Sequence, residues 1–165
     1  MRISKPAGTP FTGGSKQGID QWSYDVFGAL SGWARTLNGR WTRCDDGYLL
    51  LEIDHLAGTA IEPILIDTAN DELRVEFGYW ETELPEEAAD AEGAAQEAIK
   101  LVSDWLTGSI QTAVFTDEDG RWCGSMIVER GEPVPTAPSQ GMLSFNPTKV
   151  ELRSPQRQQW ETYSV

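Results

Sequence analysis

Apolar residues recur along the chain with two different periods, and the places where the period changes separate predicted helices from predicted strands. After Asp20, apolar side chains return every three or four residues, which is the spacing of one face of an amphipathic helix. These positions are Trp22, Val26, Leu30, Trp33 and Leu37. Asp20 is a suitable N-cap, and Asn38-Gly39 tolerates the left-handed conformation that ends many helices. The pattern predicts a helix over residues 20–37.

A second helix is predicted over residues 88–107, in the stretch between Pro85 and Gly108. Its predicted apolar face consists of Ala91, Ala95, Ile99, Val102 and Leu106. Glu86 and Glu87 precede this face, where carboxylates interact favourably with the positive end of the helix dipole.

Between and after the helices, short apolar runs alternate with turn-forming residues, which is the pattern of antiparallel strands. The predicted strands are residues 40–43, 48–54, 61–67, 73–84, 110–116 and 121–129, followed by short edge strands at 142–145 and 149–152. In the fourth strand, Gly78 is expected to form a bulge that turns Trp80 inward and Glu81 and Glu83 outward. The hairpin formed by residues 110–116 and 121–129 is expected to join the same sheet. The predicted fold is a single α+β domain with a mainly antiparallel sheet of five to seven strands and two principal helices.

The two ends of the chain are expected to lie outside this domain. Residues 1–18 are rich in Gly and Pro and predict a flexible N-terminal arm, and the polar residues 156–165 predict a C-terminal tail. The domain then spans residues 19–155. No stretch reads as an export signal or is apolar over the length of a bilayer, so we expect a soluble, cytoplasmic protein in which Cys44 and Cys123 stay reduced.

Charge is concentrated in the middle of the sequence. The net charge is −13, but residues 41–120 hold 20 Asp and Glu against three Lys and Arg, which gives this segment −17 and the remainder +4. A surface of this sign repels nucleic-acid phosphates and anionic membranes and attracts basic proteins. We therefore expect a protein partner, with no direct nucleic-acid binding and no membrane binding. The same charge also keeps a protein in solution without any partner.

Residues typical of metal or nucleotide sites are too few or differently spaced. His55 is the only histidine, and neither cysteine has a second cysteine nearby, which argues against a zinc site. The sequence Gly13-Gly14-Ser15-Lys16 has neither the residue order nor the preceding strand of a phosphate-binding loop. No metal and no cofactor is expected.

Two other kinds of site remain open. A strand would place Glu81 and Glu83 on one face, about 6 to 7 Å apart, which overlaps the separation of acid and base in inverting glycosidases. Against this, seven acids lie between Glu81 and Glu97, where any two look paired by chance. Rings such as Trp80 and Trp122 are candidates for lining a carbohydrate or peptide groove.

Four segments share an order of elements with a known group of proteins. They are residues 73–84 (LRVEFGYWETEL), 94–108, 110–115 and 120–125 (GRWCGS). This succession of strand, tryptophan, helix and hairpin, within residues 48–130, resembles small bacterial immunity proteins that accompany polymorphic or contact-delivered toxins. The resemblance implies that the chain binds and inhibits a cognate toxin. Such proteins often carry histidines just after the tryptophan, where this chain has Glu81 and Glu83, so a histidine-dependent role does not carry over.

Charge and resemblance lead to the same expectation, an acidic protein-binding module that inhibits a basic toxin domain without being an enzyme. Acids around the contact would speed encounter, and a buried ring would supply affinity. The predicted partner-binding residues are Trp80, Glu81, Glu83, Glu86, Glu87, Asp90 and Glu92. A phage-type decoy that mimics DNA and a small hydrolase that uses the carboxylate pair are the alternatives. The oligomeric state is left open.

Overall fold

A computed structural model describes residues 7–54, 63–85, 90–141, 146–155 and 160–165 of the chain. Within these ranges the elements are β1 (Gly8–Phe11), α1 (Gln21–Thr36), β2 (Arg40–Cys44), β3 (Leu49–Ile53), β4 (Ile64–Asp67), the 3-10 turn η1 (Ala69–Asp71), β5 (Leu73–Phe77), β6 (Trp80–Leu84), α2 (Ala91–Thr107), β7 (Ile110–Thr116), β8 (Trp122–Glu129), β9 (Gln140–Gly141), β10 (Lys149–Arg153) and β11 (Glu161–Ser164). They form two compact units. The first holds the described residues up to 101 except 78–80, and the second holds 78–80 and the described residues from 102 onward.

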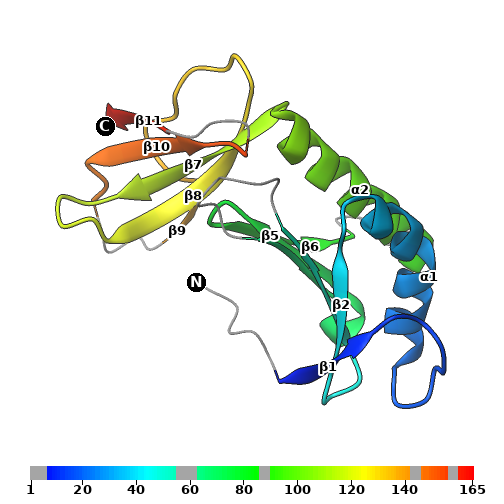
Figure 1. Ribbon diagram of the computed structural model, residues 1–165. Helices are drawn as coiled ribbons and strands as arrows, with labels where there is room; N and C mark the ends of the chain where they lie inside the picture. The colour runs from blue at the N-terminus through cyan, green and yellow to red at the C-terminus, as the bar shows by residue number, and fades with distance from the viewer. Residues whose placement is uncertain (1–6, 55–62, 86–89, 142–145, 156–159) are drawn as a thin grey trace. The chain divides into compact units, whose positions relative to one another are not determined.

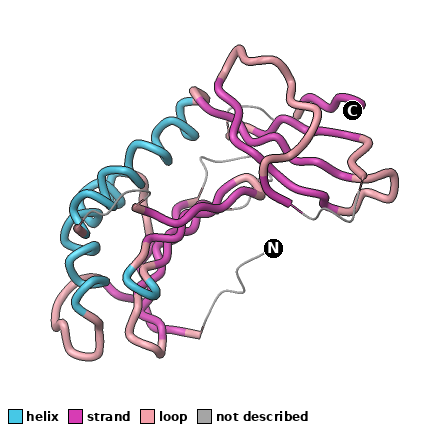
Figure 2. The backbone as a smooth tube through the Cα atoms, turned by 180° about the vertical axis from the view of Figure 1, so that it is seen from behind, coloured by secondary structure: helices cyan, strands magenta, loops and turns pink. Residues whose placement is uncertain are grey.

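The first unit is built around a six-stranded antiparallel sheet in the order β1-β2-β3-β4-β5-β6. Each strand lies beside its neighbour in the sequence, as expected for a meander. Two views show α1 and the N-terminal part of α2 along the same face of this sheet (Figure 1, Figure 2). Two α-helices and a six-stranded antiparallel sheet in the described ranges confirm the predicted α+β class.

Helix α1 begins and ends where the sequence predicts. Asp20 caps its N-terminus, since the carboxylate accepts a hydrogen bond from the Ser23 amide at 2.7 Å. Asn38, just beyond the helix end, has a φ of 54°, the left-handed conformation in which many helices stop. Val26 and Leu30 on the apolar face are completely buried. The prediction for this helix is confirmed.

A buried polar contact fixes the start of α1 against the sheet. The Ser23 hydroxyl lies 2.5 Å from the Thr68 hydroxyl, which follows β4, and it donates to the Asp20 carboxylate at 2.8 Å. Thr68 also accepts a hydrogen bond from the Leu49 amide on β3 at 2.9 Å. Because Ser23 and Thr68 are fully buried, removing either hydroxyl would leave a polar group without its partner.

Helix α2 is observed from Ala91 to the predicted end, but its buried face is rotated from the predicted one. The fully buried residues are Ala94, Ala95, Ala98, Val102 and Trp105. Ile99 and Leu106, which we place on the apolar face, are only half-buried. The core takes in Trp105 in place of Leu106, because the larger ring removes more apolar surface from water.

Residues 73–84 form a hairpin and not the single bulged strand that we predict. Gly78 and Tyr79 have φ values of 56° and 69°, the two positive values that a type I′ hairpin turn requires. The turn ends β5 and starts β6 in the opposite direction. Alternation within β6 still places Glu81 and Glu83 on one face. The prediction fails because Gly-Tyr is not one of the residue pairs that mark such turns in sequences.

The second unit contains a five-stranded antiparallel sheet in the order β11-β10-β7-β8-β9. We predict that the β7–β8 hairpin joins the first sheet, and this is wrong, since it forms the middle of a separate sheet. Its core consists of Ala113, Phe115, Cys123, Val128, Val150 and Leu152. Periodicity shows that a strand has a buried face but does not show which strand it will pair with.

Strands also occur in both segments that we assign to loose chain ends. β1 lies within the predicted arm, residues 1–18, and pairs with β2. β11 lies within the predicted tail, residues 156–165, and pairs with β10, which is therefore internal and not an edge strand. Pairing at a sheet edge needs backbone hydrogen bonds more than apolar side chains, so a polar sequence does not prevent it. The predicted strand at 142–145 lies outside the described residues.

Candidate partner-binding surface

Two of the predicted partner-binding residues lie on an edge strand. Glu81 and Glu83 share one face of β6, the last strand of the six-stranded sheet, and both side chains are exposed. Trp80 and Leu84 fall on the other face of the strand, where Leu84 is buried and Trp80 half-buried. The two carboxylates of β6 thus face the solvent, and its apolar side chains lie on the opposite face of the strand.

An ion pair between Arg74 on β5 and Asp67 on β4 lies two strands into the sheet. The Arg74 guanidinium is 2.7 Å from the Asp67 carboxylate, whose side chain is only 4% exposed. Burial opposes the charge of Arg74, but the hydrogen bond and charge of Asp67 outweigh it and raise the pKa of Arg74. Glu81 and Glu76 act in the same direction. Asp67 is the main partner of this cation, so Arg74 offsets the negative charge of β6 only through the smaller interaction with Glu81.

Asp90 and Glu92 lie at the N-terminus of α2, and each has a local structural contact. The Asp90 carboxylate accepts a hydrogen bond from the Gly93 amide at 2.9 Å, which is the geometry of an N-cap. Glu92 accepts a hydrogen bond from the Gln96 side chain at 3.1 Å, one turn further on. Both carboxylates are exposed. Their charges therefore remain accessible to a partner even though the helix also uses them.

Helix α1 contributes a further acid that the sequence does not single out. Asp25 and its neighbour Tyr24 line a surface hollow of about 400 Å³ together with Asp90 and Glu92. Gly28, which also lines the hollow, has nothing within 4 Å of the position that a Cβ would take. Asp25 lies on the polar side of the predicted helix, but only the tertiary structure shows that this side meets the start of α2.

The structure unites some of the predicted residues and leaves others apart. The two acids of α2 border one hollow, and the two acids of β6 belong to the same compact unit. Trp80 directly precedes Glu81 in β6 but lies on the opposite face of the strand from Glu81 and Glu83. Glu86, Glu87 and His55, the only histidine of the sequence, lie outside the described residues.

Aromatic rings of the second unit have structural contacts. Trp122, which we consider for a groove, is half-buried and donates its indole N–H to the Ser125 hydroxyl at 2.9 Å. The Arg153 guanidinium lies over the rings of both Tyr79 and Trp160, with its Cζ atom 4.7 Å and 4.4 Å from their centroids. These contacts hold the rings within the unit.

Cys44 and Cys123 are each 1% exposed and belong to different units. Burial raises the pKa of both thiols. Each side chain therefore acts as a small apolar residue of its core. In the part of the chain that the structure describes, no group of three or more His, Cys, Asp or Glu side chains is arranged to hold a metal ion.

No family model, curated protein or solved structure matches this chain. Neither helix in the described ranges combines the length and the hydropathy that crossing a bilayer requires.

Proposed function

We propose that this chain is an acidic protein-binding module that inhibits a cognate bacterial toxin by covering a basic surface, in the manner of an immunity protein. The hollow between α1 and α2 carries the proposal, because Asp25, Asp90 and Glu92 all border the same space of about 400 Å³. The exposed glutamates of β6 add to the negative charge of this unit. Basic groups of a partner complement such a surface and are attracted to it before contact.

Local structure explains part of this charge but not all of it. Asp90 caps α2, and the helix dipole favours an acid at Glu92. Asp25 belongs to α1, where the Gln21 amide donates to it at 2.6 Å but brings no positive charge. Like charges around one hollow repel each other, and solvent, salt and the Lys16 ammonium, which lies 5.9 Å from the centroid of the Tyr24 ring, reduce that cost. A Lys or Arg side chain of a partner entering the hollow would replace this repulsion with attraction.

The glutamates of β6 support binding more readily than hydrolysis. A hydrolase with paired carboxylates keeps one carboxyl group in an apolar site, where it stays protonated. Glu81 and Glu83 are both exposed on an edge strand instead. Charged side chains on an edge strand also prevent it from pairing with strands of other chains. Glu81 and Glu83 therefore protect the sheet edge in addition to their proposed role in partner binding.

Coexpression with a basic toxin domain encoded beside this chain tests the proposal. The chain should abolish toxicity, and the two purified proteins should form a complex that weakens as salt is added. A variant with D25N, D90N and E92Q should lose protection, because asparagine keeps the cap at position 90 while the three charges are removed. The control variant D45N/D46N/E118Q removes as many charges from exposed turns and should still protect.

Either of two results would contradict the proposal. In one, the chain protects cells but forms no complex with the toxin. In the other, the chain displaces the toxin from DNA only by occupying its DNA-binding cleft as a duplex would, and any variant of equal net charge does the same. The second result would favour the decoy that mimics DNA.

A further inference from the structure

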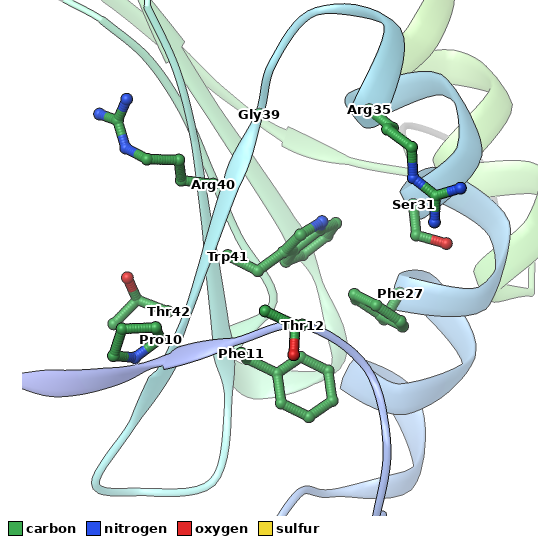
Figure 3. Close-up of a pocket in the computed structure, with 10 residues that line it drawn as sticks. All are labelled: Pro10, Phe11, Thr12, Phe27, Ser31, Arg35, Gly39, Arg40, Trp41 and Thr42. Atoms are coloured by element: carbon green, nitrogen blue, oxygen red, sulfur yellow. The ribbon is translucent and has the colours of Figure 1, made fainter.

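A second cavity, of about 490 Å³, lies within the first unit, away from the acidic hollow. Phe27, Ser31 and Arg35 line it from α1, where a spacing of four residues places them on one face of the helix. β1 and β2 supply the remaining walls, including Phe11 and Trp41 (Figure 3). The volume lies within the range of small-molecule sites, about 300 to 1,000 Å³.

Three aromatic rings form an apolar wall of this cavity. Phe27 meets Phe11 edge-to-face with ring centroids 4.9 Å apart, and it meets Trp41 in the same way at 5.2 Å. Figure 3 shows the Phe27 and Trp41 rings turned toward each other across the space between α1 and β2. Trp41 is 8% exposed, whereas both phenylalanines are half-buried. Part of the aromatic surface is therefore open to a planar ligand.

The polar groups of the cavity are a guanidinium and hydroxyls. Arg35 and Ser31 lie side by side on α1 (Figure 3). Within the described residues, the exposed Arg35 side chain has no ion pair and no hydrogen bond. Arg40 also lines the cavity but points away from it, and its guanidinium pairs with Glu52 and with Asp54. Arg35 is thus the cation that is left for a ligand.

We propose that this cavity binds a small organic anion that combines a planar apolar ring with a carboxylate. The ring lies against Phe11, Phe27 and Trp41, and the carboxylate binds the Arg35 guanidinium, whose fork of donors matches the two oxygens. Ser31 offers a further hydrogen bond beside it. The net charge of −13 repels anions at long range. Within the cavity, the unpaired guanidinium beside an apolar wall favours an anion.

Titration of the full chain with indole-3-acetate, followed by calorimetry and by ligand-observed NMR, tests this site. Neutral indole and cationic tryptamine share the ring and serve as comparators. Indole-3-acetate should bind about tenfold more tightly than indole, the gain expected from a charge-assisted hydrogen-bonded pair. Arg35→Gln should remove that gain and leave the affinity for indole unchanged.

Two further variants separate the site from the general properties of the chain. Arg130→Gln removes an exposed arginine of the second unit and should leave the affinity for indole-3-acetate unchanged. Ser31→Phe places a ring in the cavity and should abolish binding of all three probes. A thermal melt of each variant checks that it is folded.

The proposal is overturned if tryptamine or indole binds as tightly as indole-3-acetate, or if Arg35→Gln binds indole-3-acetate like the unmodified chain. It is equally overturned if indole-3-acetate shows no saturable binding up to about 10 mM, the weak limit for a ligand of this size. These outcomes are independent of the toxin-binding proposal, which concerns the acidic hollow.

Discussion

Gly78 occupies a position that accepts no larger side chain. Its φ of 56° lies in the left-handed region, and a Cβ atom there would meet Thr112 Oγ1 at 2.5 Å and Trp105 Cη2 at 2.8 Å. The Thr112 hydroxyl also donates a hydrogen bond to the Gly78 carbonyl at 2.9 Å. This bond is buried, so the two segments cannot move apart without losing it. Close approach, in addition to the turn conformation, requires glycine here.

Gly78→Ala should lower the free energy of unfolding by about 3 kcal/mol or more, because steric overlap adds to backbone strain. Gly120→Ala is the matched control. Its φ is also positive, at 79°, but nothing lies within 4 Å of the new Cβ, so it should cost only about 1 kcal/mol. Urea unfolding of both variants measures the difference. Equal losses would show that the neighbours of Gly78 move aside freely.

Tyr48 is expected to make the free energy of unfolding fall as the pH rises into the alkaline range. Burial of the half-buried side chain raises the pKa of Tyr48 to about 12, from an ordinary value of 10.0. The unfolded chain therefore loses this proton more easily than the folded chain. Tyr48 stabilises the fold fully below about pH 10, and that contribution disappears as the pH rises from there toward 12.

Unfolding in urea at several pH values between about 9 and 11 measures this effect. The midpoint should fall with rising pH in the unmodified chain, and it should fall less steeply in Tyr48→Phe, which has no phenol to ionise. Cys44 has a raised pKa as well and is coupled to Tyr48 by a side-chain hydrogen bond, so the same pair of curves is also measured in a Cys44→Ala background. Parallel curves for the two proteins would mean that Tyr48 ionises in the folded chain at its ordinary pKa.

Elements whose boundaries depend on local chemistry are the ones that the sequence predicts well. α1 has its cap at Asp20 and its left-handed residue at Asn38, and both positions agree with the structure. The strands on either side of the Asp117–Gly120 turn also agree with it. In each case the signal lies within a few residues of the feature it predicts, so no knowledge of the tertiary structure is needed.

Elements that depend on distant partners are predicted less well. β1 and β11 carry few apolar side chains, and their pairing is a property of β2 and β10 as much as of their own residues. The same limit applies to the candidate sites. The acidic run in the sequence predicts Asp90 and Glu92 as binding residues. Asp25 and Arg35 become candidates only in the structure, because α1 lies beside α2 in the acidic hollow and beside β2 in the aromatic cavity. No spacing in the sequence brings these residues together.

The rotated face of α2 gives a prediction at the scale of an element. Val102 is completely buried, whereas Ile99 is half-buried. Val102→Asp should therefore lower the free energy of unfolding by about 3 to 5 kcal/mol, since the new carboxylate would be buried without a partner. Ile99→Asp should also destabilise the chain, but by at least about 1 kcal/mol less. Thermal and urea unfolding measure the destabilisation by each variant. If Ile99→Asp destabilises the chain more than Val102→Asp does, the buried face of α2 is centred on Ile99, as the sequence predicts.

At the scale of the whole molecule, formal charge is distributed unevenly along the sequence. Residues 41–120 carry −17 of formal charge, while the rest of the chain carries +4. Such a field acts over about 10 Å at moderate salt, which is beyond the reach of any single contact. In the proposed complex it therefore affects the association rate more than the dissociation rate. Salt should weaken this effect without changing the apolar contacts.

The association rate with the toxin domain is the most direct test of the proposed function. In a variant with E81Q, E83Q, D90N and E92Q, this rate should fall by about tenfold or more at low salt, and high salt should remove most of the difference. The control variant D45N/D46N/D71N/E118Q loses the same formal charge elsewhere and should keep a rate close to that of the unmodified chain. If the first variant is folded and associates at an unchanged rate at low salt, or if both variants slow equally, the acids of β6 and α2 are not the partner-binding surface.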